Sequence, residues 1–134
     1  MAAYQASLKL CETLAAHDVA NSGWQRDLSV SHNKIGNVLV AQGDLAGALA
    51  AYQADLKICE TLAAHDVANV QWQIDVAISC GKLGMHAGIA TDERRGYLQR
   101  GLEIEQSLKD LGRLPPNQDW IGWFEQRLQE LDTD

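Results

Sequence analysis

The sequence predicts an all-α protein in which antiparallel helix pairs repeat along the chain. Three observations carry this prediction. Residues 2–21 return almost unchanged as residues 50–69, an offset of 48 positions, with differences only at Ser7/Asp55 and Leu10/Ile58. Apolar residues within each copy recur at the 3.6-residue spacing of one helix face. Proline occurs only at positions 115 and 116, and the alternation of β-branched residues that strands require is scarce.

The repeat extends beyond the near-identical segment. Trp24 matches Trp72, and Gly36 matches Gly84, at the same offset. A third, weaker copy follows, because "LEIEQSL" at 102–108 resembles "LKICETL" at 56–62. Periods of 20–50 residues are typical of stacked arrays. We therefore divide one domain, 1–134, into a partial unit 1–22, two full units 23–69 and 70–117, and a capping helix 118–134.

Each full unit is predicted to contain two helices. Apolar spacing and breaking residues place helices at 2–17, 23–42, 45–65, 70–89, 92–111 and 118–131. In "QGD", Gly43 is expected to supply a left-handed residue after one helix, and Asp44 to cap the next. Asn21 or Ser22 is expected to cap the helix that contains Trp24. The Pro115–Pro116 pair separates the last two helices.

Net charge, cysteine content and hydropathy indicate which partners and which cellular compartment to expect. The formal net charge is −7 and the pI about 4.9, so an anionic surface would repel nucleic acid. Three cysteines without a CxxC motif argue against a disulfide framework and for a reducing compartment, hence a cytoplasmic protein. No apolar run has the length of a membrane span, so we expect no membrane association.

The segment "HNKIGNVLVAQGDLAGALAAYQADLKI" (32–58) resembles a tetratricopeptide repeat (TPR). The motif positions are filled by Ile35-Gly36, Leu39, Gly43-Asp44, Ala48 and Tyr52. The next unit keeps Leu83-Gly84 but loses the Gly-Asp turn. The usual period is 34 residues, so the resemblance is to a long-helix variant with a period of about 48. It implies a short right-handed α-solenoid of about six helices, with Gly36, Ala48, Tyr52 and Gly84 where helices approach closely.

The resemblance also implies a concave surface along which a peptide lies. By register with Gly36, this groove is expected to include Val30, Asn33, Asn37, Val40 and Ala41, and one unit later Ile78, Gly81, Met85, Gly88 and Ile89. Asn33 and Asn37 share a helix face, where their amides could hold a peptide backbone. A clamp for a C-terminal carboxylate is disfavoured by Gly81 and Met85, so an apolar or amphipathic helix fits better. The alternative is that these residues only pack neighbouring helices.

No catalytic, metal or cofactor site is predicted. Cys11 and His17, like Cys59 and His65, are six residues apart, which places them on different faces of a helix. Ser29, Ser31 and His32 do not form an oriented triad on one helix. Equivalent acids in successive repeats form ladders, whereas an active site needs different groups that converge. We therefore expect no enzyme activity.

The sequence thus favours a non-catalytic module that binds a peptide or helix of another protein. One alternative is a self-assembling segment, closed as a dimer or extended head to tail. Another is a regulatory part of a larger signalling protein or enzyme, and the start of the chain within a repeat favours a piece of a longer array. The last helix carries an apolar face that could cap the array or form a homodimer: Trp120, Trp123, Phe124, Leu128 and Leu131.

Overall fold

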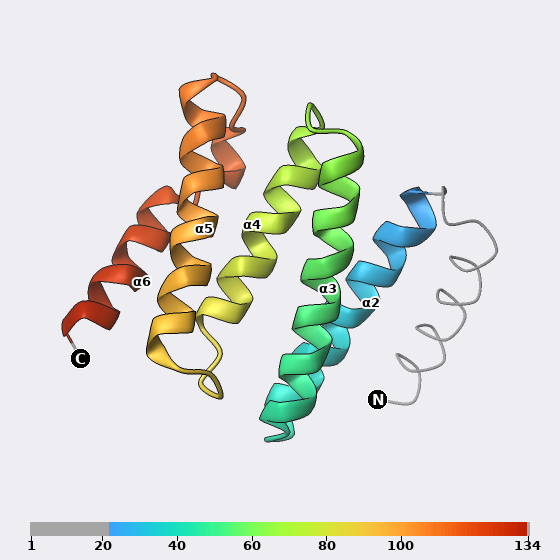
Figure 1. Ribbon diagram of the computed structural model, residues 1–134, viewed down its shortest axis with the longest axis vertical. Coiled ribbons are helices and arrows are strands. Elements are labelled where there is room, and N and C mark those ends of the chain that lie inside the picture. Colours follow the sequence, from blue (N-terminus) through green and yellow to red (C-terminus); the bar gives the residue numbers. More distant parts are fainter. Residues whose placement is uncertain (1–21, 134) are drawn as a thin grey trace. The chain divides into compact units, whose positions relative to one another are not determined.

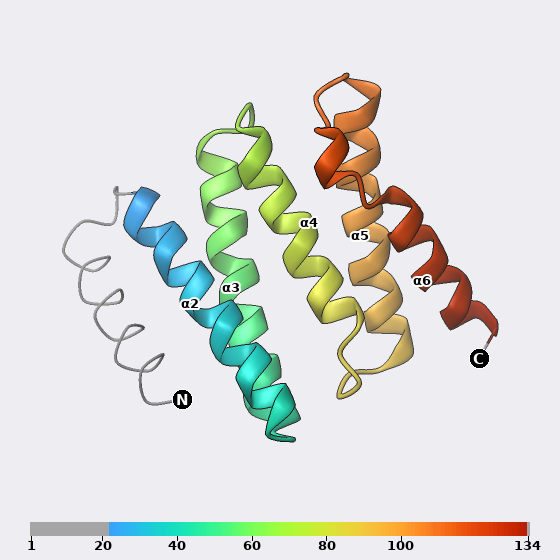
Figure 2. The same cartoon turned by 180° about the vertical axis from the view of Figure 1, so that it is seen from behind.

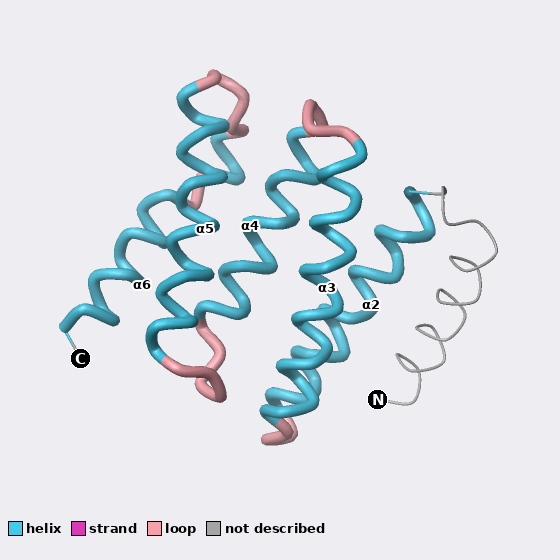
Figure 3. Tube along the Cα trace, viewed as in Figure 1, coloured by secondary structure: helices cyan, strands magenta, loops and turns pink. Residues whose placement is uncertain are grey.

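The computed structural model describes residues 22–133, and this part of the chain is helical without strands (Figures 1 and 3). The all-α prediction is therefore confirmed for the described residues, whereas the helix predicted at 2–17 lies outside them. The chain divides into two compact units, Met1–His65 and Asp66–Asp134. The helices are α2 (Ser22–Ala41), α3 (Leu45–His65), α4 (Val70–Gly84), α5 (Thr91–Asp110) and α6 (Ile121–Thr133), with a 3₁₀ turn, η1, at Pro116–Gln118.

The first unit contains the antiparallel hairpin of α2 and α3 (Figure 1). In the turn between them, Gly43 and Asp44 have the predicted roles. Gly43 takes the left-handed conformation, with φ at 82°. The Asp44 N–H donates to the Leu39 carbonyl at 2.9 Å, and the Asp44 carboxylate accepts from the Gly47 N–H at 2.9 Å. Gly43 therefore ends α2, and Asp44 caps the first turn of α3, as expected.

Close approach of α2 and α3 depends on one small residue from each helix. A Cβ added at Gly36 would lie 2.5 Å from Cε1 of Tyr52, so the tyrosine ring rests directly on the glycine backbone. Ala48 is fully buried, at 0% exposure. Tyr52, Leu56 and Cys59 continue the buried stripe of α3. At this joint, the contact between α2 and α3, the Tyr52 ring of α3 packs directly against the backbone of α2 at Gly36.

The second unit begins with the hairpin of α4 and α5. Asn69 caps α4, because its side chain accepts from the Trp72 N–H at 3.1 Å. The helix predicted at 70–89 is wrong at its end, since α4 stops at Gly84. The following residues form a compact turn in which the buried His86 accepts from the Gly88 N–H through Nδ1 at 2.9 Å. Glycines at 81, 84 and 88 also weaken helix propensity here.

Helix α6 packs against α5 in this second unit (Figure 2). It begins at Ile121, three residues later than predicted, because Asp119 is extended and its side chain accepts from the Ile121 N–H at 3.1 Å. The apolar face of α6 joins the core around Ala77 and Leu98. Phe124 and Leu131 are buried in it, and three further residues pack on its edge: Trp120, Trp123 and Leu128. This face therefore lies within its own unit.

Candidate functional site

The predicted groove residues of the first full repeat share one face of α2. Val30 and Val40 are each 43% exposed, which is high for valine, and Asn37 is exposed between them. Asn33 lies on the same face and is half-buried, and Ala41 is exposed at its end. The other side of α2 is buried and contains Leu28, Ile35 and Gly36, among others. We call Val30, Asn33, Asn37 and Val40 the α2 face.

The two asparagines of the α2 face are held by hydrogen bonds. The Tyr52 hydroxyl donates to Asn37 Oδ1 at 2.7 Å, and Asn37 Nδ2 donates to Asn33 Oδ1 at 3.3 Å. Burial raises the pKa of the Tyr52 hydroxyl, so it remains a protonated donor at neutral pH. Asn33 Nδ2 in turn donates to Asp55 Oδ2 at 3.2 Å. These hydrogen bonds give each amide a defined orientation.

Asp55 is the buried end of this chain of hydrogen bonds. Its side chain is on α3, and the residue is 3% exposed. Besides Asn33, its carboxylate accepts from the Ser29 hydroxyl and from the Cys59 thiol, whose Sγ lies 3.4 Å from Oδ1. A buried carboxylate is tolerated when donors surround it. We call the set that runs from the surface to the core the Asp55 network: Ser29, Asn33, Asn37, Tyr52, Asp55 and Cys59.

The second full repeat does not reproduce this face. Met85 is 43% exposed and Ile78 is half-buried, but Met85 lies just beyond the end of α4. Ile89 is half-buried in the loop before α5, because α4 is shorter than predicted. Gly81 is buried, and a Cβ there would lie 3.3 Å from the Trp123 ring. The structure therefore brings together the groove residues of α2, whereas those of the second unit are divided between helix and loop.

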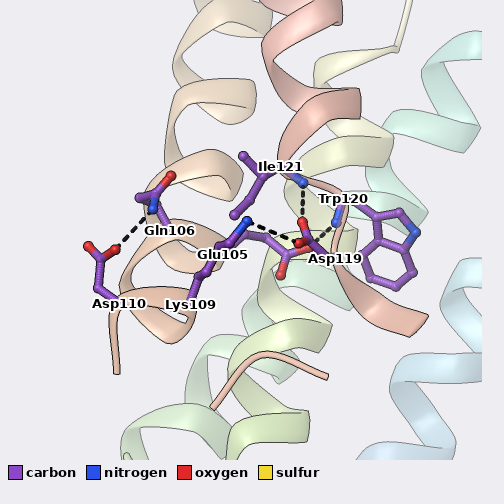
Figure 4. Close-up of polar contacts among 7 residues, drawn as sticks. All are labelled: Glu105, Gln106, Lys109, Asp110, Asp119, Trp120 and Ile121. Carbon is purple, nitrogen blue, oxygen red and sulfur yellow. Dashed lines mark hydrogen bonds and ion pairs between the residues drawn. The ribbon is translucent and has the colours of Figure 1, made fainter. Parts of the chain in front are cut away.

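Glu105 on α5 forms a second polar site, near the start of α6 (Figure 4). It is 0% exposed, and its Oε1 accepts from the Trp120 N–H at 3.0 Å. Its other oxygen, Oε2, has no hydrogen-bond partner among the described residues. Burial raises the pKa of this carboxyl; the Trp120 hydrogen bond partly opposes the shift, and the nearby charge of Asp119 adds to it.

Sequence reasoning missed both Asp55 and Glu105 as site residues. A signal existed for Asp55, since it replaces Ser7 in two otherwise nearly identical copies. Glu105 falls at the position of Cys59 when Leu102 is matched with Leu56. Nothing in the local pattern around Glu105 distinguishes a buried glutamate from a solvated one, because the N–H that it accepts from lies 15 residues further along the chain.

A metal site or a membrane span would require specific features within the described part of the chain. No group of three or more His, Cys, Asp or Glu residues there could hold a metal ion. None of its helices is both long and apolar enough to cross a membrane. Cys59 and Cys80 are buried cysteines. In comparisons with known proteins, no family model, no curated protein and no solved structure matches this chain.

Proposed function

We propose that this protein is a TPR-like helical-repeat array, with right-handed stacking of its units, that binds a peptide or helix of another protein without catalysing a reaction. The binding surface is the α2 face. One observation carries the proposal: two exposed valines, Val30 and Val40, flank an asparagine pair whose amides are already oriented. Apolar contact area beside fixed polar groups is the usual composition of a recognition surface.

The TPR assignment is supported by the shared design of the two hairpins. A Cβ at Gly36 would meet Tyr52 at 2.5 Å, and a Cβ at Gly84 would meet Leu98 at the same distance. In both hairpins a glycine on the first helix receives a large side chain from the second. This is the arrangement that the resemblance implies for Gly36 and Tyr52, and it recurs where the sequence match is weaker.

The dimensions of the α2 face define the class of partner. Ten residues separate Val30 from Val40, which corresponds to about 15 Å along a helix. An amphipathic partner helix of about three turns would cover this length, with apolar side chains at both ends. A polar group at its centre would meet Asn37, where a carbonyl could compete with Asn33 for the Asn37 N–H groups. The partner is thus apolar at two points and polar between them.

Site-specific crosslinking tests this surface. A photoreactive residue at position 40 should capture a partner from cell extract, whereas the same residue at the exposed position 57 on α3 should not. The captured protein is then purified, and its affinity measured against the variant Val30→Glu/Val40→Glu. We expect a loss of at least about tenfold, because each new carboxylate would be desolvated against an apolar group.

A matched control separates binding from folding. Gln53→Glu/Lys57→Glu adds acidic residues at two exposed positions of α3 and should leave the affinity unchanged. The affinity of Asn37→Ala for the captured protein tests the polar centre of the α2 face. The affinity of Met85→Glu tests whether the second unit takes part in binding. Equal capture from positions 40 and 57, or undiminished affinity of the valine variant, would contradict binding at the α2 face. Sedimentation of the purified protein shows whether the captured partner is a second copy of this chain.

A further inference from the structure

The docking of α6 places a carboxylate in an unusual position. Trp120 is the N-cap of α6, because its carbonyl accepts from the Phe124 N–H at 3.0 Å. Its own N–H donates to Glu105 Oε1 at 3.0 Å. In a capping box, a glutamate three residues into the same helix performs this role. Here the acceptor comes from a different helix, so the contact joins α5 to the start of α6 (Figure 4).

The second oxygen of Glu105 is the unsatisfied part of this contact. Glu105 is 0% exposed, and Oε2 has no hydrogen-bond partner among the described residues. An ionised carboxylate with one unsatisfied oxygen loses its hydration without full compensation, and a neutral carboxyl group loses much less. Undocking of α6 would return Glu105 to water and remove this penalty. The penalty therefore falls on the docked state alone.

We propose that Glu105 is a pH-sensitive latch for α6: protonation of its carboxyl holds the helix on the α4–α5 hairpin, and ionisation loosens it. Two charged residues beside the latch act in opposite directions, and the anionic one favours the protonated form. Asp119, beside the start of α6, repels the ionised form. Lys109 on α5 forms an ion pair with Asp119, with 3.5 Å between Nζ and Oδ2. Asp119, which lies just before α6, is the charged residue that contributes to the raised pKa of Glu105.

The sign of the pH dependence follows from the raised pKa of Glu105 in the docked state. A group that binds its proton more tightly in the docked state stabilises docking at low pH. This stabilisation is fully present below the ordinary pKa of glutamate and is lost as pH rises through the raised value. Docking of α6 should therefore strengthen as pH falls from neutral toward the ordinary glutamate pKa of 4.5.

Amide hydrogen exchange of the full chain measures the docking directly. Protection factors of the α6 amides, corrected for the intrinsic effect of pH, are followed from about pH 8 to about pH 5. We expect them to rise as pH falls, by up to about tenfold for each pH unit between the ordinary and the raised pKa. Glu105→Gln keeps an acceptor for the Trp120 N–H and should abolish this rise. Glu103→Gln, at an exposed position two residues earlier, should preserve it.

A second variant keeps the test decisive if Glu105→Gln does not fold. Asp119→Asn removes the repelling charge but retains an oxygen for the Ile121 N–H, so the pH midpoint of α6 protection should move to lower pH. The latch is overturned if wild-type protection does not change with pH, if Glu105→Gln keeps the wild-type profile, or if Asp119→Asn leaves the midpoint in place.

Discussion

The α2–α3 and α4–α5 hairpins are copies of one repeat, and they agree at the joint between their helices. Gly36 receives Tyr52 in the first, and Gly84 receives Leu98 in the second, with the added Cβ at 2.5 Å from the ring or side chain in both. The large side chain can change from tyrosine to leucine because its contact with the glycine requires only bulk, although the Tyr52 hydroxyl also donates to Asn37. The glycine cannot change, because the backbone itself is the contact surface.

The two hairpins differ at the positions next to this glycine contact. The first has Asn33 and Asp55, linked by a hydrogen bond at 3.2 Å. The second has Gly81 at the position of Asn33, and Gly101 at the position of Asp55 when Leu102 is matched with Leu56. Gly101 lies against Phe124 of α6, and Gly81 lies against Trp123 and Phe124. One hairpin therefore fills this region with hydrogen-bonded polar groups, and the other opens it for an aromatic ring. The comparison indicates that the glycine contact between the two helices is kept in both hairpins. The neighbouring positions differ, because in the second hairpin they pack against α6.

The largest effect is expected when the Phe124 ring is removed. Phe124→Ala should destabilise the second unit by about 3–5 kcal/mol, because a large cavity forms above Gly101 and Gly81. Chemical denaturation gives the loss, and hydrogen exchange shows where it falls. Protection in α4, α5 and α6 should drop more than in α2 and α3. A uniform drop across both hairpins would argue against a specific role for the ring.

A smaller effect is expected when a side chain is added at Gly101, on the α5 surface that the Phe124 ring contacts. Gly101→Ala would place a Cβ 2.4 Å from Phe124 Cε1, and we expect a loss of about 3 kcal/mol from overpacking. Gly96→Ala lies on the same helix with nothing within 4 Å, so it should instead gain up to about 1 kcal/mol from helix propensity. Thermal unfolding of the two variants measures both. Equal shifts would mean that the glycine at 101 is not required by the ring.

The polar flank of the first hairpin is tested at its centre. Asp55→Ala leaves Ser29, Asn33 and Cys59 without their shared acceptor and should cost about 2 kcal/mol. A double-mutant cycle with Asn33→Ala should show coupling of at least about 0.5 kcal/mol. Denaturant titration of the four proteins supplies these values. Simple additivity would show that the network is a set of separate contacts.

The smallest expected effect is at the surface end of the same network. Asn37→Ala removes the acceptor of the Tyr52 hydroxyl and should cost about 1 kcal/mol. In the Tyr52→Phe background the same substitution should cost less, because the hydroxyl is already absent. Unfolding free energies from urea titration decide this. An unchanged cost in that background would place the effect of Asn37 elsewhere.

Much of the fold and part of the α2 face were predictable from the sequence. Helices α2, α3 and α5 begin and end within one residue of their predicted bounds, because apolar spacing and capping residues are local signals. The end of α4 was predicted five residues too late. The side chain of His86 closes a turn with Gly88 there, and helical spacing does not detect that contact. The position of Asn37 on the face of α2 followed from register alone.

The sequence by itself determined the repeat, the helical class and the small residues at the helix joints, since these depend on spacing within one unit. Only the tertiary structure decided which polar residues are buried together. Asp55 meets donors 22 and 26 residues away, and Glu105 meets the Trp120 N–H 15 residues away. The physical reason is that the cost of burying a carboxylate depends on the groups that surround it in space, and those groups come from other helices.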